Sequence, residues 1–226
     1  MTLGKIFRIA LMAIFIVPCV ILAVGCGGNG SSLPKKAIAE VGSSVISNNS
    51  DDNLDLAQKK LQEGQELASQ GKYENAIKAY NESIELFQNL SETYLSRAIA
   101  YKHLGKYELA INDFDKAIEI NPDFATAYYV RGCAYDVLGI YDKAISDYDK
   151  VILINPNKPS YYNSRGMAYA VIGNYHQAIA DATKAIKIDP NNTESYVLRG
   201  ICLEKLGATE EAISDYLKAK ELGYTG

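Results

Sequence analysis

A period of 34 residues governs the sequence from residue 57 onward. Five successive repeats fit this period without insertion or deletion: residues 57–90, 91–124, 125–158, 159–192 and 193–226. The fifteenth place of every repeat is glycine, namely Gly71, Gly105, Gly139, Gly173 and Gly207. The twentieth place is always alanine, namely Ala76, Ala110, Ala144, Ala178 and Ala212. A period of about 20 to 50 residues indicates a chain built from stacked copies of one supersecondary unit.

Each repeat predicts a pair of antiparallel helices. About 13 residues with helical apolar spacing precede the glycine, which adopts positive φ easily and so lets the chain reverse. A second amphipathic stretch follows, and in three repeats it ends near a proline at the thirty-second place: Pro122, Pro156 and Pro190. Proline stops a helix because it lacks the backbone N–H. Small residues at the eighth and twentieth places let the two helices approach closely, and tyrosines fill the gaps around them.

Length, spacing and residue types together resemble the tetratricopeptide repeat family, over about three quarters of the chain. The resemblance implies an all-α, right-handed α-solenoid of five helix-turn-helix repeats that binds other proteins and is not an enzyme. The first and last repeats match least well, because Gln88 and Tyr224 stand where the family has proline.

The first 26 residues have the features of a secretion signal. Lys5 and Arg8 precede an apolar stretch over residues 9–24, and the end, Leu-Ala-Val-Gly-Cys, resembles a bacterial lipobox. We therefore expect a signal peptide over residues 1–25, a lipidated Cys26 carrying acyl chains such as palmitate, and a flexible linker over residues 26–56. This predicts a lipoprotein of the bacterial cell envelope, facing the periplasm or exterior. Ordinary secretion and an uncleaved membrane anchor are the alternatives.

The family resemblance also implies where a partner binds. In tetratricopeptide proteins the first helices line a concave face, and a peptide or helix contacts side chains at the second, fifth, ninth, twelfth and thirteenth places. The corresponding residues here are Leu95, Ile99, Lys102, Tyr129, Cys133, Asp136, Asn163, Met167, Val197, Ile201 and Glu204. Several of them are alternatively expected to pack against a neighbouring repeat.

Charged residues recur at two other places. The seventh place of repeats two to five is arginine (Arg97, Arg131, Arg165 and Arg199), and the twenty-third is aspartate (Asp113, Asp147, Asp181 and Asp215). Both are missing from the first repeat, which has Glu63 and Ala79. Because the two places lie at similar heights on antiparallel helices, we predict structural ion pairs. The alternative is that the arginines line a site for acidic ligands.

Composition argues against other functions. With 23 basic and 27 acidic residues, the chain lacks the positive charge that nucleic-acid binding needs. The only histidines, His103 and His176, have no cysteine or carboxylate at metal-ligand spacing, so we expect neither a metal nor a cofactor. No motif for nucleophilic or phosphoryl-transfer chemistry is present.

The last repeat leaves a second function open. Lys220 and Thr209 replace the isoleucine and tyrosine of the earlier repeats, as expected where no neighbour covers the surface. Because no separate covering helix follows, the C-terminal repeat could pair with another copy, which would make the protein a self-associating component of an envelope assembly.

Overall fold

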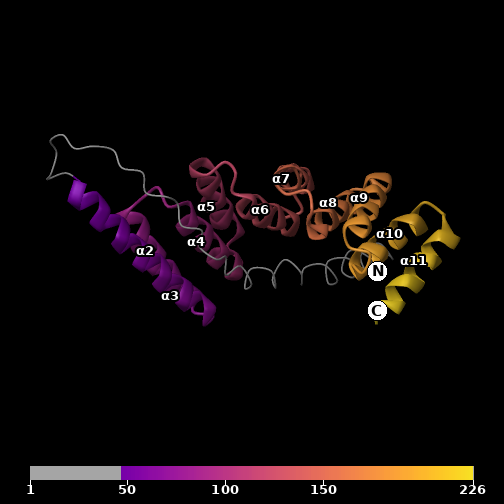
Figure 1. Cartoon of the computed structure of the whole chain (residues 1–226), viewed down its shortest axis with the longest axis horizontal. Coiled ribbons are helices and arrows are strands. Elements are labelled where there is room, and N and C mark those ends of the chain that lie inside the picture. Colours follow the sequence, from indigo (N-terminus) through magenta and orange to yellow (C-terminus); the bar gives the residue numbers. More distant parts are fainter. Residues whose placement is uncertain (1–46, 226) are drawn as a thin grey trace. The chain divides into compact units, whose positions relative to one another are not determined.

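The computed structural model describes residues 47–225, and these residues form ten α-helices and no β-strand (Figure 1). This confirms the all-α prediction and the succession of helix pairs. The described chain divides into two compact parts, one ending at Leu104 and the other starting at Gly105. The predicted signal peptide and Cys26 lie outside the described residues.

The first part contains α2 (Ser47–Ser69), α3 (Tyr73–Leu86) and α4 (Ser91–His103). α3 packs against both α2 and α4. Ala76, Tyr80 and Ala100 form the core, and burial raises the pKa of Tyr80 to about 12. The ring of Tyr73 stacks on that of His103 with centroids 4.5 Å apart.

Helix α2 is longer than the sequence pattern indicated. We expected a flexible linker up to residue 56, whereas the helix already begins at Ser47. The Ser- and Asn-rich composition favoured a linker, but Leu54, Ala57 and Leu61 have the i, i+3, i+7 spacing of one helix face. Ala57 is fully buried, and its carbonyl oxygen accepts a hydrogen bond of 2.8 Å from Ser83 Oγ. The helix therefore begins before the first repeat, whose first residue, Ala57, packs against α3.

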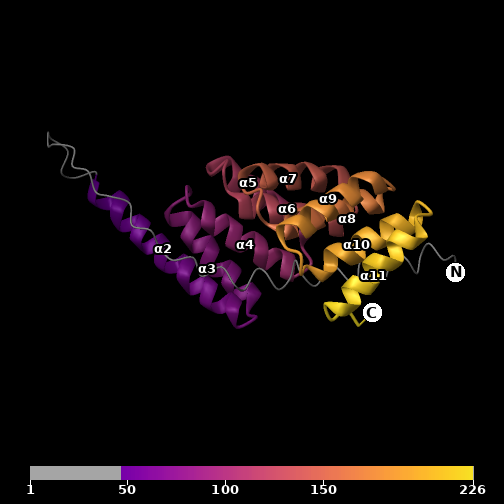
Figure 2. The same ribbon diagram turned by 45° about the vertical axis from the view of Figure 1, so that its right-hand side comes forward.

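The second part contains seven helices, each packed against the next in chain order. They are α5 (Tyr107–Ile120), α6 (Ala125–Val137), α7 (Tyr141–Ile154), α8 (Pro159–Val171), α9 (Tyr175–Ile188), α10 (Thr193–Lys205) and α11 (Thr209–Glu221). Figure 2 shows the last hairpin, α10–α11, at the yellow end of the ribbon. α5, α7 and α9 each end two residues before a proline, because proline disfavours helical geometry in the residue that precedes it.

Glycine makes the turn inside each hairpin. Gly139 has φ +74°, a conformation that is strained for residues with a Cβ. In this geometry the N–H of Ile140 donates to the carbonyl oxygen of Tyr135 at 2.9 Å, and the N–H of Gly139 donates to that of Asp136 at 3.0 Å. These bonds satisfy carbonyl groups at the end of α6 and direct the chain into α7.

Candidate protein-binding face

Side chains from α6, α8 and α10 form one face of the second part. α8 contacts both α6 and α10 directly, so these first helices of successive repeats are neighbours. We call this surface the first-helix face and define its accessible part by four predicted residues: Asp136, Met167, Ile201 and Glu204. Glu204 is exposed and the other three are half-buried, so both apolar side chains and the Glu204 carboxylate are accessible.

Four other residues predicted for partner binding are buried: Tyr129, Cys133, Asn163 and Val197. For these the structure corrects the expectation of an accessible side chain. The Tyr129 ring packs against that of Tyr161 with centroids 5.0 Å apart. The Val197 side chain is only 2% exposed. These side chains therefore hold the repeats together and are not presented to a partner.

The buried amide of Asn163 belongs to a polar network that joins α8 to α10. Its Nδ2 donates to Asn192 Oδ1 at 2.9 Å, and Ser195 Oγ donates to its Oδ1 at 2.8 Å. Asn192 also caps α10, because its Oδ1 accepts a hydrogen bond of 3.0 Å from the backbone N–H of Ser195. Buried amides are stable only when hydrogen-bonded, so this network fixes the packing of the two first helices.

The first part supplies three predicted residues, all on α4. Leu95, Ile99 and Lys102 are half-buried. Burial lowers the pKa of the Lys102 ammonium, because a partly desolvated charge is less stable than a solvated one.

Tyrosine hydroxyl groups hold the two carboxylates of the first-helix face. The hydroxyl of Tyr148 donates to Asp136 Oδ2 at 2.5 Å, and that of Tyr216 donates to Glu204 Oε2 at 2.9 Å. In both pairs the tyrosine follows the acid by 12 residues and comes from the second helix of the same repeat. This pairing was not predicted, although the recurrence of an acid at the twelfth place and a tyrosine at the twenty-fourth is visible in the sequence.

Asp136 carries the most perturbed carboxyl group on this face. Burial raises its pKa to about 7, even though the hydrogen bond from Tyr148 favours the charged form. Its second oxygen, Oδ1, is buried and has no hydrogen-bond partner among the described residues. An unsatisfied buried carboxylate oxygen costs free energy, and a donor from outside would remove that cost.

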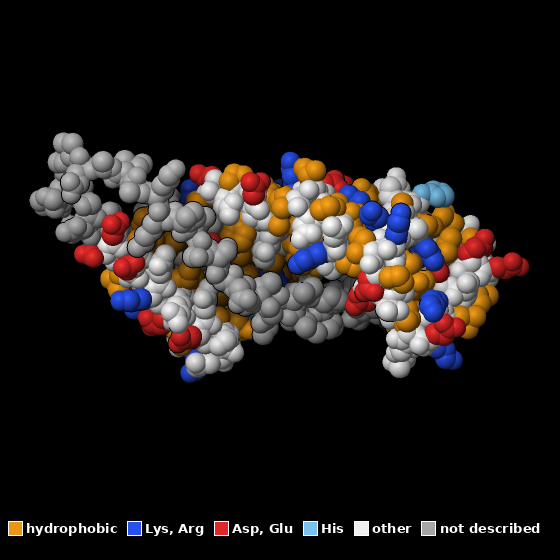
Figure 3. All heavy atoms as spheres, in the orientation of Figure 1, with side chains coloured by type: hydrophobic (Ala, Val, Ile, Leu, Met, Phe, Trp, Pro, Cys, Tyr) orange, Lys and Arg blue, Asp and Glu red, His pale blue; other side chains and the backbone are white. Residues whose placement is uncertain are grey.

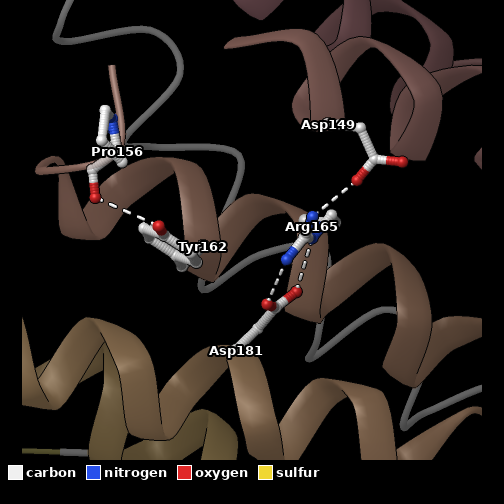
Figure 4. Close-up of polar contacts among 5 residues, drawn as sticks. All are labelled: Asp149, Pro156, Tyr162, Arg165 and Asp181. Carbon is white, nitrogen blue, oxygen red and sulfur yellow. Dashed lines mark hydrogen bonds and ion pairs between the residues drawn. The ribbon is translucent and has the colours of Figure 1, made fainter. Parts of the chain in front are cut away.

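The predicted charge pairs are bidentate in repeats three, four and five. Arg165 Nη2 donates to Asp181 Oδ1 at 2.6 Å, and its Nε donates to Oδ2 at 2.9 Å (Figure 4). Arg131 holds Asp147, and Arg199 holds Asp215, in the same geometry. The paired aspartates are almost fully buried.

Each arginine also contacts the preceding repeat, which the sequence analysis missed. Arg165 Nη1 donates to Asp149 Oδ1 at 2.5 Å, so the guanidinium lies between Asp149 and Asp181 (Figure 4). Asp115 is the corresponding second acceptor for Arg131. The repeated patterns Asp-Phe-Asp and Asp-Tyr-Asp are the sequence signal for this contact. The hydrogen bond to Asp181 raises the pKa of Arg165, so the guanidinium remains charged at any ordinary pH.

Arg97 lies in the first part, and its predicted partner Asp113 lies in the second. Arg97 Nη1 donates to Asn81 Oδ1 at 2.6 Å. Asn81 occupies the same place of its repeat as Asp149, so the contact to the preceding repeat also occurs in the first part. Asp113 is buried.

Family models match most of the region that the structure describes. Models of the tetratricopeptide repeat match residues 91–124, 125–158, 159–192 and 182–214, and a further model, described as TPR repeat, matches residues 64–105. The chain belongs to the tetratricopeptide repeat family. Its helix pairs, turn glycines and small interhelical residues are therefore those of tetratricopeptide hairpins.

Solved tetratricopeptide structures have the same fold. A crystal structure of MamA is 28% identical, covers 70% of this chain and 93% of its own, and has a TM-score of 0.68. MamA from Desulfovibrio magneticus RS-1 is 24% identical over 74% of this chain and 95% of its own, with a TM-score of 0.71. YrrB, described as a TPR protein with an unusual peptide-binding site, is 19% identical over 80% of this chain and 93% of its own, with a TM-score of 0.68. No curated protein matches the chain significantly.

Among residues 47–225, no cluster of three potential metal ligands occurs. The thiol of Cys202 is fully buried, and burial raises its pKa to about 12, so it is a poor nucleophile. On the face shown in Figure 3, basic and acidic side chains are interspersed with hydrophobic ones over the described residues. No described helix has the length and apolar character required to cross a bilayer.

Proposed function

We propose that this tetratricopeptide protein is a membrane-tethered scaffold that binds an extended or helical segment of another envelope protein on its first-helix face. The fold supports a binding role, because tetratricopeptide hairpins present side chains of successive first helices along one surface. YrrB, which shares the fold, is described as having a peptide-binding site.

The observation that carries the proposal is the combination of acidic and apolar groups on this face. Met167 and Ile201 are half-buried aliphatic side chains, which suits them to pack against apolar side chains of a partner. Glu204 is exposed, and Asp136 Oδ1 is buried without a hydrogen-bond partner among the described residues. The face therefore favours a segment that alternates apolar residues with lysine or arginine.

The membrane tether is the second component of the proposal. It rests on the sequence of residues 1–26, in which a basic start, an apolar stretch and a lipobox-like end precede Cys26. Two or more acyl chains would hold a protein on a membrane almost permanently, because each buried CH₂ contributes about 0.8 kcal/mol. Mass spectrometry of the mature N-terminus tests this step, and a Cys26 with an unmodified thiol rules it out.

A pair of synthetic peptides tests the binding face. Both have the same apolar residues, and one carries lysine where the other carries glutamate. With the full chain in detergent at pH 8, we expect the lysine peptide to bind at least about tenfold more tightly, since 1.4 kcal/mol corresponds to a factor of ten. Ile201→Lys should abolish this binding, because it replaces an apolar contact with a repelling charge.

Leu153→Lys is the matched control. Leu153 lies on α7, a second helix, and is 78% exposed, so the change alters charge equally without touching the first-helix face. Equal affinity for the two peptides, or equal loss in the Ile201 and Leu153 variants, contradicts the proposal.

A further inference from the structure

Helix α11 has an apolar ridge that is exposed within the part of the chain that the structure describes. Ile213 and Leu217 are 52% and 58% exposed. At the place of Ile213, repeats three and four have Ile145 and Ile179, and both are half-buried because a following helix packs there. At the place of Leu217, the exposed residues Asp149 and Thr183 each accept a hydrogen bond from an arginine of the following repeat. A following helix would thus bury Ile213 and contact Leu217, and both are open among the described residues.

A groove lies on each side of this ridge. One has a volume of about 620 Å³ and is lined by Tyr216, Lys220 and Tyr224 together with the two ridge residues. The other has a volume of about 440 Å³ and is lined by Glu210, Ser214 and Lys218 with the same ridge. Two helices pack well when the i, i+4 ridge of each enters a groove of the other. The shape of α11 thus suits a second helix that has its own ridge.

Two charged residues flank the ridge on the same face of α11, and they indicate which helix would fit it. Glu210, Ile213, Leu217 and Lys220 follow at intervals of three, four and three residues, so they share one helix face. The stripe is symmetric about residue 215: Ile213 and Leu217 are each two residues from it, and Glu210 and Lys220 are each five. When two copies run antiparallel, Ile213 of one meets Leu217 of the other and Glu210 meets Lys220. A parallel pair would place like charges together.

The opposite end of the chain does not fit this ridge. On α2, three exposed polar residues, Lys59, Gln62 and Glu66, stand at the places where α4 has Thr93, Ser96 and Ala100. A polar surface at these places would have to be desolvated against Ile213 and Leu217. Head-to-tail stacking of copies is therefore unfavourable. A dimer whose two copies are related by a two-fold axis remains as the possible assembly.

We propose that two copies of the chain form an antiparallel α11–α11 dimer, with Ile213 packed on Leu217 and Glu210 paired with Lys220 across the interface. The four residues of this interface lie on α11, whereas the first-helix face is formed by side chains of α6, α8 and α10. A helix of 13 residues is about 20 Å long. This is small compared with the roughly 800 Å² per partner of standard interfaces, so the dimer is weak in dilute solution. Confinement on a membrane would raise the effective concentration.

Sedimentation of the full chain in detergent tests the proposal. We expect the mean mass to rise toward that of a dimer between about 1 μM and 1 mM, the range of weak complexes. Leu217→Glu should weaken association at least about tenfold, whereas the control Leu153→Glu, which alters an equally apolar exposed residue of α7, should leave it unchanged. Circular dichroism checks that each variant keeps its helices.

Reversing the charge of Glu210 or of Lys220 gives the decisive comparison of association. The Glu210→Lys chain and the Lys220→Glu chain should each associate poorly alone, because like charges then face each other. Their mixture should associate as the unaltered chain does, since each contact again joins opposite charges. Unaltered chain that stays monomeric throughout, association that survives Leu217→Glu, or a mixture no better than either variant overturns the antiparallel dimer.

Discussion

The ring of Tyr148 occupies the space that a side chain on Gly132 would need. A Cβ built on Gly132 would lie 2.8 Å from Cε1 of Tyr148, closer than carbon atoms approach without displacement. Gly200 and Tyr216 have the same relationship at 2.8 Å. The hydroxyl groups of these two tyrosines hold the carboxylates of Asp136 and Glu204. Thus the small residue inside the hairpin also sets the position of an acidic group on the first-helix face.

Gly132→Ala should destabilise the protein. Overpacking costs about 1 to 3 kcal/mol, and the higher helix propensity of alanine returns at most about 1 kcal/mol. In a Tyr148→Leu background the same change should become neutral or stabilising, because the ring is gone. A double-mutant cycle of unfolding free energies by urea denaturation measures this coupling. Equal effects in both backgrounds would show that the ring does not require the glycine.

The two acceptors of Arg165, Asp181 and Asp149, should contribute unequally to stability. Arg165→Ala leaves the buried carboxylate of Asp181 without its main partner, and we expect a loss of about 3 to 5 kcal/mol. Asp149→Ala removes only the half-exposed acceptor, for which about 0 to 1 kcal/mol is expected. Thermal or chemical unfolding of both variants provides the comparison. Similar losses of unfolding free energy in the two variants would mean that the contact between repeats, and not the buried pair, stabilises the protein.

Asp136 should make stability depend on pH. Its pKa is about 7 in the folded state and about 3.9 when unfolded. Between these values the folded state binds more protons, so stability falls as pH rises from about 4 to 7 and changes no further above that. Asp136→Asn removes this term while the amide oxygen still accepts from Tyr148. The stability of the variant relative to the unaltered chain should therefore increase across this window. A constant difference between pH 4 and 8 would mean that Asp136 titrates normally.

Helix boundaries were predictable from the sequence because the residues that end helices recur at fixed places. α4, α6, α8 and α10 begin at the first residue of their repeats, and glycine or proline lies two residues after the end of every described helix except α3. The accessibility of the first-helix residues was less predictable. Helical spacing gives the direction of a side chain relative to its own helix, but burial depends on which turns of that helix the neighbouring helices cover. For this reason Tyr129 and Val197 share a face with Met167 and Ile201 but are buried.

The second acceptor of each arginine was missed for a different reason. Pairing Arg165 with Asp181 needs only the geometry of one hairpin, in which both residues lie at the same height. The contact with Asp149 depends on how one hairpin stacks on the next, and the period does not specify that offset. The recurring Asp-Tyr-Asp and Asp-Phe-Asp patterns mark the second aspartate as a repeated feature, but its partner depends on the stacking of hairpins.

Site-specific photo-crosslinking in the native envelope tests the central claim, that the first-helix face binds another protein. A photoreactive amino acid replaces Met167 in one strain and Leu153, on the second-helix side, in another. We predict a discrete adduct with one other envelope protein from position 167, lost when Ile201→Lys is added, and no such adduct from position 153. The same adduct from both positions, or adducts from position 153 alone, would contradict the assignment of this face.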